Sequence, residues 1–231
     1  MRIITNPKKI QRNYKIGLYT SLASLVFLFI AVGLTLTQTT SLTTYSFAAM
    51  LAGLVLSQIG VYFANRWGKS PRIDERLTQS LKGLDDRYTL YHYTTPVPHL
   101  LTGPAGLWVL VPQYQGGQIT YDGKRYRQQG VGLFGRLISQ EGLGRPDAEA
   151  QAYEEDMRKF LTAKLEEQSR PPLRSLIVFT SPKATVQAGD APITTMHVEK
   201  LKDFIRRKAK EEPANLPLIE QVEDLLPDDD L

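Results

Sequence analysis

The chain has 231 residues, of which 42% are hydrophobic and 23% charged, enough for one domain of ordinary size with additional segments. It contains no cysteine, which excludes disulfides, thiolate metal sites and a cysteine nucleophile. Residues 16–65 contain no Asp, Glu, Lys, Arg or His, and an uncharged stretch of this length excludes a simple soluble globule.

The net charge of +4 is unevenly distributed along the chain. Residues 1–73 hold eight of the 28 basic residues and no acidic residue, so residues 74–231 carry 20 basic against 24 acidic residues, a net charge of −4. The basic character therefore belongs to the flanks of the uncharged stretch. A soluble part with net negative charge disfavours nucleic acid as a partner without excluding it.

Two apolar runs, 17–37 and 45–64, lie inside the uncharged stretch. Each is about 20 residues long, the length that a helix needs to cross the hydrocarbon core of a bilayer. Basic residues flank the pair and the connecting loop has none, so the positive-inside rule places both termini and the soluble domain in the cytoplasm. We expect a two-pass protein of the plasma membrane with residues 1–15 as a basic cytoplasmic N-terminus. A cleaved signal peptide is the alternative for the first run, but no A-x-A pattern follows it.

The second apolar run has a row of small residues, Ala49, Gly53 and Ser57, at four-residue spacing. This spacing places them on one helix face, which allows another helix to approach closely. Packing against the first run is the favoured interpretation, and homo-oligomerisation is the alternative. Gln58 is the one strongly polar side chain deep in this run, and we expect it to form a hydrogen bond across the pair.

The periodicity of the remaining chain predicts an alternation of helices and strands. In chain order these are a helix over 71–84, strands over 89–93, 97–101 and 107–111, a hairpin of 119–121 with 125–128, a helix over 146–168, a strand over 173–179 and a helix over 198–210. This order predicts one mixed sheet flanked by helices, an α/β domain over 70–211. A short helix and an acidic tail follow over 212–231, and the glycines of 130–146 leave the path of that segment open.

Residues 96–119, PVPHLLTGPAGLWVLVPQYQGGQI, resemble the nuclease-related domain (NERD) family. The family pattern has an IDH triplet, a GP-x-G turn, a VFVIE-x-K strand and an SG-x-I segment. The resemblance implies a restriction-endonuclease-like fold of a helix, three strands, a helix and a strand over about 70–205. Glu75 and Gln151 match its accessory positions.

The residues that carry the family's chemistry are absent. Such nucleases hold a divalent cation between an Asp and a Glu, and a Lys two residues after the Glu assists the attacking water. The matching positions here are Pro98, Val111 and Gln113, whereas His99 keeps its place. The resemblance therefore implies a degenerate site, with Glu75, His99 and Gln151 as weak candidates and no expected metal or cofactor.

Three functions follow from this interpretation. The first is a bacterial-type membrane protein whose inactive nuclease-like domain binds or scaffolds a protein partner. The second is an active nuclease that uses Mg²⁺ on migrated ligands such as Glu75, Asp74 or Asp122. The third is an accessory membrane-assembly subunit that acts through its helix hairpin. A His92/His99 metal pair is disfavoured because no cysteine or acid lies nearby, and the basic cluster 124–127 is interpreted as a solvated edge strand.

Overall fold

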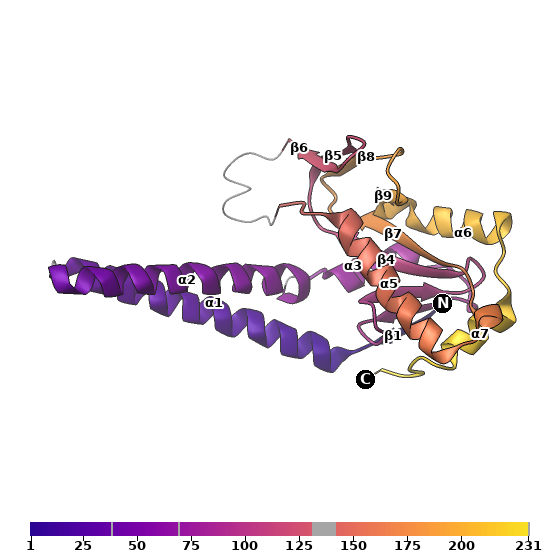
Figure 1. Cartoon of the computed structure of the whole chain (residues 1–231), viewed down its shortest axis with the longest axis horizontal. Helices are drawn as coiled ribbons and strands as arrows, with labels where there is room; N and C mark the ends of the chain where they lie inside the picture. Colours follow the sequence, from indigo (N-terminus) through magenta and orange to yellow (C-terminus); the bar gives the residue numbers. More distant parts are fainter. Residues whose placement is uncertain (38, 69, 131–141, 231) are drawn as a thin grey trace. The chain divides into compact units, whose positions relative to one another are not determined.

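The computed structural model describes residues 1–37, 39–68, 70–130 and 142–230. The chain divides into two compact units, a helical hairpin of Lys8–Arg72 and a mixed α/β domain formed by Met1–Pro7 with Ile73–Leu231 (Figure 1). The conformation that the sequence left open over 130–146 lies partly outside the described residues.

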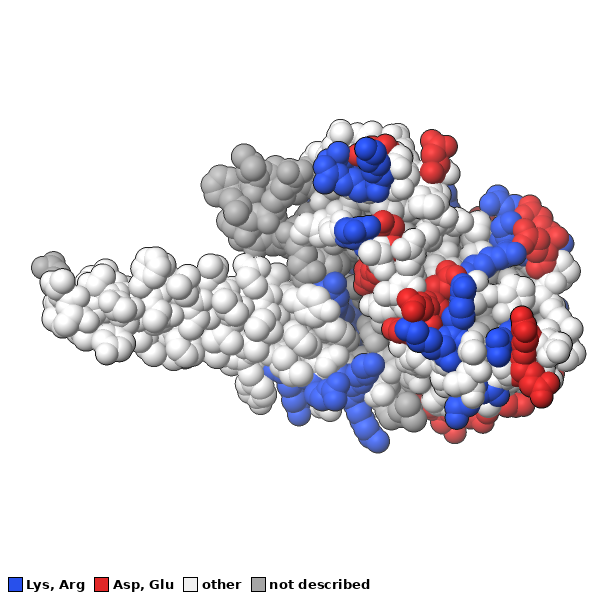
Figure 2. Space-filling model, viewed as in Figure 1, with Lys and Arg blue, Asp and Glu red and all other residues white. Residues whose placement is uncertain are grey.

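Two long apolar helices make up the hairpin. Helix α1 spans Pro7–Leu36, and helix α2 spans Thr43–Phe63 between the short turns Thr40–Leu42 and Ala64–Gly68. By length and composition, both helices could cross a membrane. Figure 2 shows that their visible surface lacks charged side chains along most of its length, as the uncharged stretch requires.

Small residues bring the two helices of the hairpin together. A Cβ atom on Gly60 would lie 2.3 Å from the Ser21 Oγ and 3.2 Å from its Cα, and one on Gly53 would lie 3.0 Å from Leu28. Ala49 is also buried, whereas Ser57 is only partly buried. The row containing Ala49 and Gly53 therefore packs within the chain, as the favoured interpretation predicted, and is not available to a second copy.

The domain contains a six-stranded sheet in the order β1-β2-β3-β4-β7-β9. Its strands are β1 (Arg2–Thr5), β2 (Thr89–His92), β3 (His99–Thr102), β4 (Leu107–Gln113), β7 (Leu173–Phe179) and β9 (Thr195–His197). The β2-β3 and β3-β4 pairs are antiparallel, and the other three pairs are parallel. The predicted mixed sheet is therefore present, although β1 and β9 were not expected.

Helices cover both faces of this sheet. They are α3 (Ile73–Leu81), α5 (Pro146–Lys164), α6 (Leu201–Glu211) and α7 (Leu216–Glu223). Alternate residues of β4 enter opposite cores: Val109 and Val111 pack in the cluster with α5 and α7, and Trp108 and Leu110 in the cluster with α3 and α6. Burial on both faces explains why the first five residues of β4 and the last four of β7 are continuously apolar rather than alternating.

A second sheet has three strands in the order β6-β5-β8. The predicted hairpin forms it from β5 (Gly117–Tyr121) and β6 (Tyr126–Gln129), joined by β8 (Ala184–Gln187), which pairs parallel with β5. The expectation of a single sheet is therefore wrong. Strand β8 alternates half-buried apolar with exposed polar residues, but it has only four residues, too few for the alternation to indicate a strand.

Strand β1 corrects the predicted domain boundary. Residues 1–15 were expected to form only a basic tail, but Arg2–Thr5 pairs parallel with Thr89–His92. Ile4 is 2% exposed and belongs to the core cluster shared with α5 and α7. The domain is therefore assembled from chain on both sides of the hairpin.

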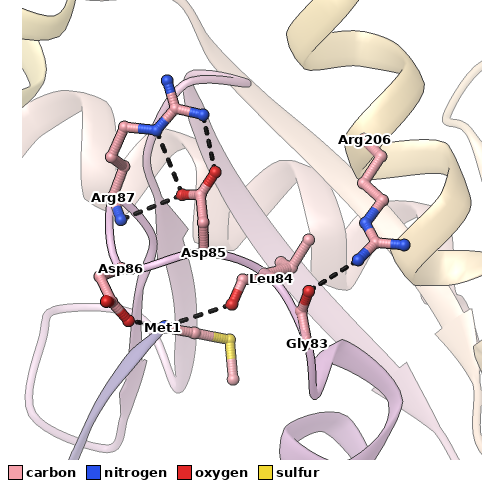
Figure 3. Close-up of polar contacts among 7 residues, drawn as sticks. All are labelled: Met1, Gly83, Leu84, Asp85, Asp86, Arg87 and Arg206. Atoms are coloured by element: carbon pink, nitrogen blue, oxygen red, sulfur yellow. Dashed lines mark hydrogen bonds and ion pairs between the residues drawn. The ribbon is translucent and has the colours of Figure 1, made fainter.

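Polar contacts hold the start of β1 against the turn between α3 and β2 (Figure 3). The Met1 amine donates to the Leu84 carbonyl at 3.3 Å and to the Asp86 carboxylate at 3.0 Å. The Asp85 carboxylate accepts hydrogen bonds from the Arg87 side chain, which lower its pKa below the usual value. On the other side of the turn, Arg206 of α6 donates to the Gly83 carbonyl at 2.6 Å. These contacts tie β1 and α6 to one turn.

Candidate functional site

Pro98, Val111 and Gln113, the positions that the resemblance singled out, lie just before β3 and near the end of β4. The β3-β4 pairing joins Leu100 with Val109 and Leu101 with Trp108. Pro98 directly precedes β3, and Val111 lies two residues after Val109 in β4. Pro98 and Val111 offer no side-chain oxygen, and Val111 is fully buried within the core.

Two buried histidines lie side by side on the neighbouring strands β2 and β3. His92 and His99 pair directly across β2 and β3, and their Nδ1 atoms are 2.8 Å apart. The Thr78 hydroxyl of α3 lies 2.9 Å from the His92 Nε2. The Nδ1 contact requires one ring to donate and the other to accept, so at least one ring must be neutral. Both imidazoles are therefore hydrogen-bonding groups of the buried strands β2 and β3.

Gln113, which stands where the family has its Lys, is held by α5. Its Nε2 donates to the Glu149 carboxylate at 2.9 Å, and the Tyr153 hydroxyl donates to the other oxygen of Glu149 at 3.1 Å. The Gln113 carbonyl accepts from the Thr180 amide at 2.7 Å. Sequence comparison had indicated Gln151 as the matching helix residue, but its side chain is exposed. The resemblance did not indicate Glu149, which lies two residues before Gln151 in α5 and is the residue that bonds Gln113.

The carboxylates proposed as migrated ligands belong to separate parts of the domain. Asp74 and Glu75 occupy the first turn of α3, where acids are favoured by the helix dipole. Asp122 lies in the β5-β6 turn, where hydrogen bonds from the Arg125 amide, the Arg127 side chain and the Lys124 amide lower its pKa to about 2. Asp122 is therefore explained as a turn residue. Across the described ranges, no group of three or more His, Asp or Glu side chains could hold a metal ion.

The two basic clusters have structural partners. In the β5-β6 cluster, Tyr126 is 5% exposed and its hydroxyl lies 2.6 Å from that of Thr195, while Arg127 pairs with Asp122. Strand β6 is the edge of its sheet, as predicted. On α6, Arg207 and Lys208 form ion pairs with the glutamates one turn later. The edge position of β6 agrees with the interpretation of residues 124–127 as an edge strand, although Tyr126 itself is buried.

A cleft lies where β7 and β9 end, with a volume of ≈ 390 Å³. Backbone contacts fix three of its lining side chains: Arg76 donates to the Thr180 carbonyl at 3.0 Å, His197 bonds the Ser181 carbonyl at 2.9 Å, and Lys202 donates to Lys82 at 3.3 Å. Ligands of α/β sheets bind outside the carboxyl ends of parallel strands. This cleft is a candidate binding surface that the sequence did not indicate, because its residues come from three separate segments of the chain.

No family model, curated protein sequence or solved structure matches the chain.

Proposed function

We propose that this chain is a two-pass membrane protein whose cytoplasmic domain binds or scaffolds a partner and does not cleave nucleic acid. The observation that carries the membrane part is the pairing of β1 with β2. The chain leaves the domain after β1, runs through α1 and α2, and returns to the same domain at α3. Both ends of the hairpin must then open on one side of a bilayer, which agrees with the orientation that the flanking charges favour.

The order of elements supports the relation to restriction-endonuclease-like folds. Helix α3, the antiparallel strands β2, β3 and β4, helix α5 and the parallel strand β7 follow in the order that the family resemblance implies. Strands β1 and β9 and the three-stranded sheet are additions to that core. The resemblance thus rests on topology as well as on the motif of residues 96–119.

The chemistry of the motif supports a binding role rather than catalysis. Hard cations such as Mg²⁺ require oxygen ligands, and Pro98 and Val111 supply none from their side chains. The Gln113 amide cannot act as the ammonium group that a Lys would provide, and it already bonds Glu149. A domain with the proposed fold but without these carboxylates is suited to binding rather than cleavage. The cleft beside β7 and β9 is the candidate surface for a protein partner.

The test of the catalytic part uses the whole chain in detergent micelles, because a fragment that starts after the hairpin would lack β1. Mg²⁺ and Mn²⁺ are titrated by calorimetry, and cleavage of DNA and RNA is followed on the same samples. We expect no saturable metal binding and no cleavage. Metal-dependent cleavage that Glu75→Ala abolishes, with Glu155→Ala on the exposed face of α5 as the matched control, would establish the alternative of an active nuclease with migrated ligands.

The test of the membrane part uses the absence of cysteine in the chain. Single variants Thr40→Cys in the connecting turn and Lys124→Cys in the domain are treated with a membrane-impermeant maleimide in intact bacterial cells. We expect labelling of Thr40→Cys from outside, and labelling of Lys124→Cys only after lysis. Extraction of the chain from membranes by alkaline carbonate would contradict the proposal.

A further inference from the structure

The surface of α2 turned away from α1 carries a polar side chain that the hairpin does not satisfy. The sequence predicted that Gln58 would bond across the helix pair, and this prediction is wrong, because Gln58 is exposed. It lies almost opposite Gly53 and Gly60, which face α1. Its neighbours on the outer surface are all apolar or aromatic and exposed: Phe47, Leu51, Leu54, Val55 and Tyr62. We call this surface the outer face of α2.

Three hydroxyl groups of the hairpin are satisfied by backbone carbonyls of the hairpin itself. The Thr20 hydroxyl donates to the Ile16 carbonyl at 2.8 Å, and the Thr35 and Ser46 hydroxyls each donate to the Ala31 carbonyl at 2.8 Å. Within the described part of the chain, the Gln58 amide has no hydrogen-bond partner. A primary amide offers two donors and an acceptor, and leaving it unpaired in hydrocarbon is costly.

The depth of Gln58 follows from the helix geometry. Helix α2 has 21 residues and is therefore about 31 Å long, close to the thickness of a hydrocarbon core of about 30 Å. Gln58 is five residues before Phe63, the end of α2, which corresponds to about 7.5 Å along the helix axis. In the proposed membrane arrangement, the amide then lies inside the hydrocarbon layer and below the headgroups.

We propose that two copies of this chain associate in the membrane through the outer face of α2, with the two Gln58 amides bonded to each other. This inference rests on the membrane insertion proposed above. All copies insert in one orientation, because the domain closes on β1 and holds both hairpin ends on one side. Two hairpins therefore meet in parallel with Gln58 at the same depth. The amide is self-complementary, so a two-fold contact allows reciprocal hydrogen bonds.

A second copy of this chain is the partner that we infer for the outer face of α2, because it presents an amide at the depth of Gln58. Any other partner would have to carry a polar group at the same depth and on a matching apolar surface, whereas a second copy always does. The small-residue row, which the sequence indicated as the alternative interface, is already buried against α1. The interface thus moves to the opposite side of α2.

The association is measured with the full chain reconstituted in phosphatidylcholine vesicles. Lys124→Cys, in the exposed β5-β6 turn, is labelled with donor or acceptor dyes, and energy transfer is followed as lipid is added to dilute the protein. We expect Gln58→Leu to weaken association about tenfold, as expected for loss of interhelical hydrogen bonds worth about 1–2 kcal/mol in membranes. Gln58→Asn keeps an amide and should retain most of the association. Val55→Leu, an apolar change on the same face, is the matched control.

The face itself is tested by disulfide trapping. A single Leu51→Cys, two helical turns before Gln58, should cross-link between copies on brief oxidation, whereas Val26→Cys, exposed on α1, should not. Equal association of wild type and Gln58→Leu, or no association of a chain that resists carbonate extraction, would refute the inference while leaving the proposed function intact. A chain that carbonate extracts would instead refute the membrane proposal on which it rests.

Discussion

The proposed membrane topology depends on the pairing of β1 with β2, and Ile4→Ala tests this pairing directly. Ile4 is 2% exposed in the core beneath α5 and α7, whereas the neighbouring Ile3 is 42% exposed and belongs to neither core cluster. Replacing isoleucine by alanine removes three carbon groups, each worth about 0.8 kcal/mol when buried. The remaining cavity adds to this loss, so Ile4→Ala should lower the free energy of unfolding by about 3 kcal/mol.

The control for this prediction is the same substitution one residue earlier. Ile3→Ala changes the composition of β1 equally but removes little buried area, so its effect should stay below about 1 kcal/mol. For a chain of this size, about 3 kcal/mol corresponds to a decrease in Tm of about 6–12 °C.

The assay follows thermal unfolding of the full chain in micelles by Trp108 fluorescence. Trp108 is 2% exposed within the α/β domain, and Trp67→Phe removes the signal of the second tryptophan. Equal, small shifts for Ile4→Ala and Ile3→Ala would show that β1 is not part of the folded sheet. The domain would then no longer include chain from both sides of the hairpin, and nothing in the fold would require both hairpin ends to lie on one side of a bilayer.

Two further predictions concern the buried histidines and the β5-β6 turn. His99→Phe should destabilise the domain by about 2 kcal/mol, because it leaves the His92 Nδ1 buried without its partner, and His92→Phe combined with His99→Phe should cost less than the sum of the two single changes in urea unfolding. Additive losses would contradict the direct bond between the rings. The Asp122 pKa, lowered to about 2 from 3.8, means that this group stabilises the fold above about pH 4 and loses that contribution as the pH falls toward 2. Asp122→Asn should therefore lower Tm at pH 5 and have a smaller effect at pH 2.5, measured by circular dichroism, and an equal effect at both values would contradict the assigned role.

Much of the architecture could be predicted because it depends on local pattern. The uncharged stretch of 16–65 predicted both long apolar helices, the continuous apolar sequence of 107–111 predicted β4 as a central strand, and 173–179 was predicted as the strand β7. The Asp122-Gly123 dipeptide predicted the hairpin of β5 and β6, because it combines a side-chain acceptor for the turn amides with a glycine at φ 85°.

The contacts that decide the candidate sites come from residues distant in sequence. Strand β1 has only four residues, and its partner β2 lies beyond the whole hairpin, so no local period marks it as a strand. The resemblance indicated which strand positions would carry carboxylates, but the approach of Glu149 to Gln113 depends on how α5 packs across β4. The direction of side chains on α2 also depends on tertiary packing. Gln58 points outward because Gly53 and Gly60, on the opposite side of the helix, face α1.

The sequence by itself therefore determined most of the helices and strands and their order, and it showed that Pro98, Val111 and Gln113 carry no carboxylate. Composition and periodicity report burial and local backbone preference, and these properties are encoded residue by residue. Only the tertiary structure decided that the domain includes the strand before the hairpin, that two histidines share one hydrogen bond, and which face of α2 remains free. Each of these features is a contact between segments that are separate in the chain. The energy of such a contact depends on both segments, so the local sequence of one segment does not reveal it.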